Sequence, residues 1–148
     1  MKEIFFESPS PDSKRMVIFE DNGTSAWLYL ASAANYDVEK DAFVYSPLEP
    51  RAELNREGIN QGEPPILISE YASDTAVIQI EDENELSILW SENGRNVAVF
   101  HNEEVIAAIY EDEKRGYSKA LSKKSGFGKP WSEEKYQKYF PEPSGDFF

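Results

Sequence analysis

Residues 76–110 read AVIQI EDENE LSILW SENGR NVAVF HNEE VIAAIY, which is four short apolar runs with polar residues between them. The runs are Ala76–Ile80, Leu86–Trp90, Asn96–Phe100 and Val105–Tyr110. Short runs that are rich in β-branched and aromatic residues are typical of β-strands. Separators of only four or five residues oblige neighbouring strands to run antiparallel. The segment therefore predicts a four-stranded antiparallel meander.

An Asn-Gly dipeptide marks a hairpin on the N-terminal side of this segment. Asn22 and Gly23 lie between the apolar runs Met16–Phe19 and Ser25–Leu30. A type I′ turn needs positive φ at both central residues, and Asn and Gly tolerate that conformation best. The separator at residues 91–95 contains the same dipeptide, so both places predict a hairpin with a tight turn.

A helix is expected near the end of the chain. Ser132 is placed to accept a hydrogen bond from the first turn, and two Glu follow it where the helix dipole favours negative charge. Trp131 and Tyr136 have the spacing of a hydrophobic staple. Pro141 ends the helix because it lacks the backbone N–H that a helix needs.

These elements predict an α+β fold in one domain. Two further strand candidates are Ala42–Tyr45 and Ile66–Ser69, and the Pro- and Gly-rich residues 46–65 indicate a loop with room for a short helix near Arg51–Glu57. We expect an antiparallel β-sheet of about six strands with one C-terminal helix packed near it. Residues 1–140 form the expected domain, and residues 141–148 are expected to be a flexible tail.

Composition excludes several classes of protein. The chain has 148 residues, of which 40% are hydrophobic, and this is unlike a disordered sequence. It has no Cys and a single His, which excludes a disulfide scaffold, a thiolate nucleophile and a zinc site of Cys or paired His ligands. No apolar run approaches the roughly 20 residues of a transmembrane helix, and no secretory signal is recognisable. We therefore expect a cytoplasmic protein with no membrane partner.

No sequence motif indicates catalysis or a cofactor. Gly126, Gly128 and Lys129 lie close together but lack the spacing of a phosphate-binding loop. The sequence contains neither a Gly-x-Ser-x-Gly nucleophile motif nor a calcium-binding loop. His101 lies at the end of a predicted strand and is interpreted as a solvated turn residue. We expect no catalytic residue, no metal and no cofactor.

The charge of the chain is strongly polarised. The net charge is −13, and residues 1–113 contain 24 acidic and 7 basic residues, whereas residues 114–138 contain 8 basic and 2 acidic residues. A chain this acidic repels phosphates, which argues against a nucleic-acid partner. In the predicted meander, the first and third turns lie at the same end of the sheet. They bring together six carboxylates, which we call the acidic rim: Glu81, Asp82, Glu83, Glu85, Glu103 and Glu104.

The acidic rim suggests one function and leaves others open. Clustered carboxylates steer a basic partner, so the first hypothesis is a non-catalytic binding protein, such as an immunity- or antitoxin-like inhibitor of a basic protein. The same acids can serve solubility alone. A second hypothesis is a small-molecule-binding protein or minor enzyme with a pocket lined by Trp27, Tyr29, Trp90 and Phe100. A third is a homo-oligomer in which the acidic and basic regions of two copies meet.

Several of these segments resemble a known family. Val17–Gly23, followed by Trp27–Tyr29, is similar to the first hairpin of a group of small bacterial proteins known as domain of unknown function (2251). Ser87–Gly94 and Arg115–Tyr117 are similar to the second block of that family. The resemblance covers roughly residues 16–118 and implies a bacterial cytoplasmic protein with an α+β sheet. The family has no assigned activity, so the resemblance implies no catalytic residue.

Overall fold

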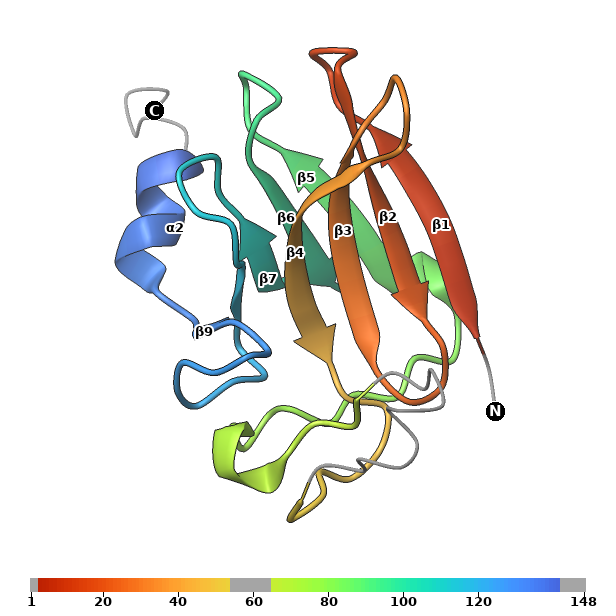
Figure 1. The fold of residues 1–148 in the computed structure, drawn as a ribbon, viewed down its shortest axis with the longest axis vertical. Helices are drawn as coiled ribbons and strands as arrows, with labels where there is room; N and C mark the ends of the chain where they lie inside the picture. The colour runs from red at the N-terminus through yellow and green to blue at the C-terminus, as the bar shows by residue number, and fades with distance from the viewer. Residues whose placement is uncertain (1–2, 54–64, 142–148) are drawn as a thin grey trace.

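Two β-sheets form the body of the protein (Figure 1). The computed structural model describes residues 3–53 and 65–141. The first sheet is antiparallel, in the order β1-β2-β3-β4, and the second has the order β5-β6-β7-β8-β9 with only the last pair parallel. The strands are β1 (Ile4–Pro9), β2 (Arg15–Asp21), β3 (Ala26–Ser32), β4 (Val38–Tyr45), β5 (Leu86–Trp90), β6 (Val97–His101), β7 (Glu104–Ile109), β8 (Tyr117–Ser118) and β9 (Lys129–Pro130). The helical elements are the 3-10 turns η1 (Ser69–Tyr71) and η2 (Glu83–Glu85) and the α-helix α2 (Glu133–Tyr139).

The two sheets pack against each other around a shared core. Val17 and Phe19 of β2 are fully buried in the same cluster as Val97 and Val99 of β6. Each sheet has one strongly apolar face, and stacking the sheets removes both faces from water. The α+β class is therefore confirmed, but the expected single sheet of about six strands is wrong.

The segment Ala76–Ile80 is not a strand of either sheet, so the expected four-stranded meander has only the three strands β5, β6 and β7. Its residues alternate in burial as in a strand, and both end residues are buried. Its backbone instead contacts the chain just after β4, where Ser46 N donates to Ala76 O at 2.8 Å and Ile78 N donates to Ser46 O at 3.0 Å. A single isolated bridge, between Ser46 and Val77, takes the place of the expected strand pairing.

Both Asn-Gly hairpins are present, but neither has a type I′ turn. The four residues 22–25 join β2 to β3, and the six residues 91–96 join β5 to β6. Only the glycine of each dipeptide has positive φ, 87° at Gly23 and 73° at Gly94. The side chains of Asn22 and Asn93 instead accept a backbone N–H two residues ahead, each at 2.9 Å. Such Asx turns stabilise a wider loop than the two-residue turn we expected.

Strand β4 links the two sheets along one side of the sandwich. Gly116 N donates to Asp41 O at 2.8 Å, and Asp41 N donates to Lys114 O at 3.4 Å. The Lys40 ammonium adds a bond to the Glu113 carbonyl at 2.8 Å. The segment between β7 and β8 is thereby attached to the first sheet.

The expected C-terminal helix is confirmed as α2. Ser132 Oγ accepts the Lys135 N–H at 3.2 Å, and the rings of Trp131 and Tyr136 are 5.3 Å apart, as a staple requires. The helix covers the outer face of the second sheet, where Phe140 packs with Tyr110 of the β7 end.

The remaining strand candidates have different outcomes. Ala42–Tyr45 is the second half of β4, whereas Ile66–Ser69 forms an isolated bridge between Ile68 and Arg51 and ends at the first residue of η1. Most of the possible helix at residues 51–57 lies outside the described residues, as does the tail from residue 142.

Candidate functional site

The first part of the acidic rim is a tight 3-10 turn that precedes β5. The Asp82 carboxylate accepts the Asn84 N–H at 2.9 Å, and the Glu85 carboxylate accepts the N–H groups of Glu81 at 2.9 Å and Asp82 at 3.0 Å. These bonds form a capping box, which fixes the turn. The Glu85 side chain is therefore folded back onto its own turn and is only half-exposed.

Strand register places this turn beside the β6–β7 turn. Leu86 lies opposite His101 in the β5–β6 ladder, and Asn102 N donates to Glu85 O at 2.6 Å. The Glu85 carboxylate is also 3.1 Å from the His101 Nε2 atom. His101 therefore has a defined hydrogen-bond partner and is half-buried, rather than simply solvated.

All six predicted rim carboxylates lie at this one end of the sandwich. Glu81, Asp82, Glu83, Glu103 and Glu104 are exposed, and Glu85 is held by His101. The rim forms even though residues 76–80 are not a strand, because the β5–β6 pairing alone brings the two turns together. The Glu104 carboxylate forms a loose ion pair with Lys119, whose Nζ atom lies 3.8 Å away.

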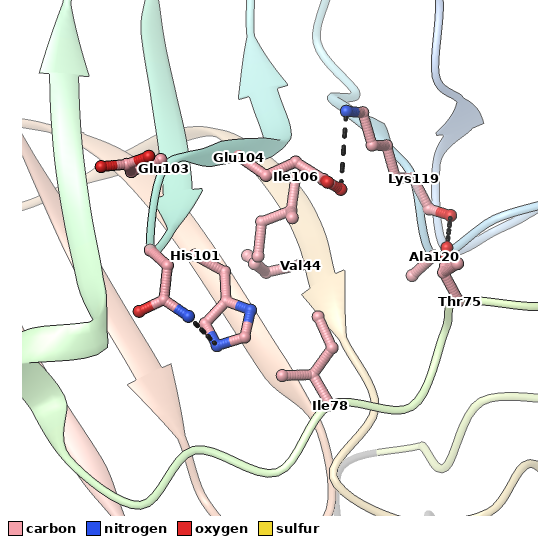
Figure 2. A pocket seen from close by; sticks show the side chains of 10 residues that line it. Val44, Thr75, Ile78, His101, Glu103, Glu104, Ile106, Lys119 and Ala120 are labelled. Atoms are coloured by element: carbon pink, nitrogen blue, oxygen red, sulfur yellow. Dashed lines mark hydrogen bonds and ion pairs between the residues drawn. The ribbon is translucent and has the colours of Figure 1, made fainter.

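A groove of about 410 Å³ opens beside the rim (Figure 2). Its apolar floor consists of Val44, Ile78 and Ile106, and its polar edge includes His101, Glu104 and Lys119. Figure 2 shows the Glu104 carboxylate turned toward Lys119 and the Glu103 carboxylate turned away from it. We call this feature the rim groove. An apolar floor with charged groups at its edge suits a ligand that is itself part apolar and part charged.

Lys119 is the functional candidate that the sequence did not reveal. Its backbone is fixed, because Lys119 N donates to Ile106 O at 2.9 Å and Lys119 O accepts the Ser73 hydroxyl at 2.5 Å. Its ammonium group lies between Glu104 and the Trp131 ring, whose centroid is 5.2 Å away. Fourteen residues lie between Glu104 and Lys119, and no spacing rule connects positions on either side of an irregular loop.

Glu85 makes the stability of this end of the protein dependent on pH. The His101 hydrogen bond, followed by the backbone N–H groups of Asp82 and Glu81, holds the pKa of Glu85 below its ordinary value of 4.5. A lowered folded-state pKa stabilises the fold above pH 4.5, and this contribution is lost as the pH falls through the folded-state value.

Replacing Glu85 with Gln is expected to lower the unfolding temperature at pH 6 and to make progressively less difference below pH 4.5. The two proteins converge because the wild-type carboxyl is then protonated and neutral like Gln. Thermal unfolding at pH 6, 4 and 3 measures this. The exposed neighbour Glu83, replaced with Gln, controls for the loss of one rim charge. A difference between E85Q and wild type that is constant with pH contradicts the prediction.

The four aromatic residues of the alternative pocket do not line one cavity. Trp27 and Tyr29 stack with centroids 6.4 Å apart, on the outer face of the first sheet. Trp90 packs at the edge of the central core and donates its indole N–H to Ser8 at 3.2 Å. Phe100 packs in the third cluster, beneath α2. Three separate clusters replace the single pocket that this hypothesis needs.

Much of the basic segment 114–138 pairs within the chain. Arg115 contacts Asp41 at 3.2 Å, and Lys135 contacts Asp112 at 3.0 Å. Lys129 and Lys135 also both pair with Glu113. In these contacts, basic side chains pair with carboxylates outside the acidic rim, whereas Lys119 pairs with Glu104 of the rim.

Two classes of site are not found in the described residues. No group of three or more His, Asp or Glu side chains there is placed to hold a metal ion. None of the helices in that part of the chain is long and apolar enough to cross a membrane.

Comparisons with protein-family models, curated proteins and solved structures give no match to this chain. The similarity of residues 16–118 to the bacterial family named above stays a prediction.

Proposed function

We propose that the protein is a non-catalytic binding protein whose acidic rim binds a basic protein partner. The observation that carries this proposal is the position of the rim groove at the acidic end of the sandwich. A flat acidic surface can serve solubility alone, but a recess beside exposed Glu103 and Glu104 offers shape as well as charge. Complementary charge mainly provides fast association and selection against wrong partners.

An inhibitor of the immunity or antitoxin type is the form of this function that we favour. Its support is the net charge of −13 in a chain of 148 residues, together with the concentration of exposed carboxylates at one end. A basic toxin or nuclease has a positive electrostatic potential, which is complementary to the negative potential of the acidic rim. An inhibitor needs only to cover such a surface, so it requires no catalytic residue of its own.

The product of the neighbouring gene is the first probe of this proposal. We expect it to bind the purified protein with a Kd that rises steeply between 20 and 300 mM salt, because exposed charge pairs are screened. The double variant E83Q/E103Q removes two exposed rim charges and is expected to weaken binding about tenfold at low salt. Titration calorimetry at the two salt concentrations measures both effects.

A matched double variant separates local from overall charge. Asp37 and Glu92 are exposed and lie in turns at the opposite end of the sandwich, so D37N/E92Q removes the same charge elsewhere. It is expected to retain affinity within about twofold. A Kd that does not change with salt contradicts the proposal, and so does an equal loss of affinity in the two double variants. The absence of association at 20 mM salt contradicts it as well.

A further inference from the structure

We propose that the rim groove binds the side chain of a lysine or arginine, and that Lys119 is a resident cation which this side chain displaces from Glu104. The inference rests on the proposed function, because it specifies how the acidic rim engages a basic partner. The ligand class is a positively charged group on an alkyl stem. Lys119 competes with such a ligand for Glu104.

The groove matches both parts of such a side chain. Lysine carries its charge on a flexible four-carbon stem, and that stem gains from contact with apolar surface. Val44 and Ile106 are buried in the floor, and Ile78 is half-buried beside them. The Glu104 carboxylate lies at the edge of that floor, where the charged end of a bound stem would emerge (Figure 2). Apolar floor and carboxylate together favour a long cation over a small ion.

Lys119 already places an ammonium group at the edge of the groove. Its stem lines the groove, and its Nζ atom contacts Glu104 at 3.8 Å, the far limit of an ion pair. The Glu104 side chain is 71% exposed, so the pair is well solvated and contributes little. An incoming cation that also buries its stem therefore competes for Glu104 at low cost.

The Lys119 ammonium already makes a second contact that it can keep when it leaves Glu104. The Trp131 ring lies 5.2 Å from Nζ, and the Trp131 indole N–H is bonded to Glu133 at 3.1 Å. A cation over an indole face is held by the ring quadrupole, and Glu133 adds a nearby negative charge. Lys119 can therefore leave Glu104 without becoming an unpaired charge, and its departure changes the surroundings of Trp131.

Titration with n-butylammonium, observed by NMR, tests the groove directly. This cation reproduces the lysine stem, whereas methylammonium has the charge without the stem and n-butanol has the stem without the charge. We expect n-butylammonium to shift the methyl signals of Ile78 and Ile106 with a millimolar Kd. At the same concentration and ionic strength, the other two compounds are expected to leave those signals in place.

Two lysine variants test the competition. Lys119→Met keeps a stem of similar length and leaves the backbone contacts of residue 119 available, and it is expected to bind n-butylammonium up to about fivefold more tightly. Lys124→Met removes the same charge from an exposed position in the same segment, and it is expected to match wild type. The Trp131 indole N–H signal is expected to move during the wild-type titration and to stay in place in K119M.

The outcomes separate this inference from the proposed function. Methyl signals that do not respond to n-butylammonium overturn the inference, as does equal affinity in K119M and K124M. Either result leaves the proposed function standing if the neighbouring gene product still binds through Glu83 and Glu103. Conversely, n-butylammonium binding with the expected Lys119 effect supports the inference even where that protein fails to bind.

Discussion

Replacing Gly116 with alanine is expected to destabilise the protein by about 3 kcal/mol, because the added methyl group has nowhere to go. An ideal Cβ at this position would lie 2.8 Å from the Ala108 carbonyl oxygen and 3.1 Å from the Ala42 Cα, and it would overlap the Ala42 Cβ. Both neighbours are fully buried parts of β7 and β4. Relief therefore requires the backbone to move where the two sheets join, which also breaks the Gly116–Asp41 bond at 2.8 Å.

Urea unfolding and the thermal midpoint measure this effect, and a drop of about 10 °C is expected for a chain of this size. Gly126→Ala is the matched control, because no atom beyond the glycine itself and its two chain neighbours lies within 4 Å of the added Cβ, and the residue is exposed. It should change stability by less than about 0.5 kcal/mol. A stable G116A protein would show that the contact between β4 and the β7–β8 segment is not rigid.

The second large effect is expected at Glu113, which connects α2 to the second sheet. Its carboxylate pairs with both Lys129 and Lys135 and accepts the Tyr117 hydroxyl at 2.5 Å. The side chain is only 18% exposed, so the interaction is stronger than a surface pair but less costly to break than a fully buried one. Glu113→Gln leaves two ammonium groups close together without their shared counter-ion, and a loss of about 2 kcal/mol is expected.

Asp112→Asn provides the comparison for E113Q. Asp112 contacts the same Lys135 at 3.0 Å, but its side chain is 44% exposed, so a loss of at most about 1 kcal/mol is expected. Hydrogen exchange in α2 should accelerate in E113Q more than in the central strands, because the helix depends on this anchor. Equal losses in the two variants would mean that Glu113 acts only as one more surface charge.

Local signals predicted the elements that depend on neighbouring residues. The cap at Ser132 and the staple of Trp131 with Tyr136 are contacts within one turn of helix, and both are present. The two Asn-Gly dipeptides located the hairpins for the same reason. The second hairpin pairs β5 with β6, and this pairing is sufficient to bring the carboxylates of the acidic rim together.

Features that depend on distant pairing were not predictable in this way. The alternating burial of residues 76–80 is compatible with pairing to β5, but hydrogen bonds to Ser46 stabilise a different neighbour. Apolar patterning identifies a buried face without saying which sheet covers it, so one sheet could not be distinguished from two. The Lys119–Glu104 contact depends on the irregular path of the chain between β7 and β8, for which no periodicity exists.

The walls of the rim groove come from four stretches of chain, around residues 44, 75–78, 101–106 and 119–120. Such a recess exists only when β4, β6, β7 and the segment after β8 are assembled, so an unfolded chain offers a partner nothing equivalent. A ligand that recognises only the assembled form is thermodynamically linked to folding, and at one hundred times its Kd it adds about 2.7 kcal/mol of stability. Any true occupant of the groove should therefore also protect the whole protein against heat, urea and proteolysis.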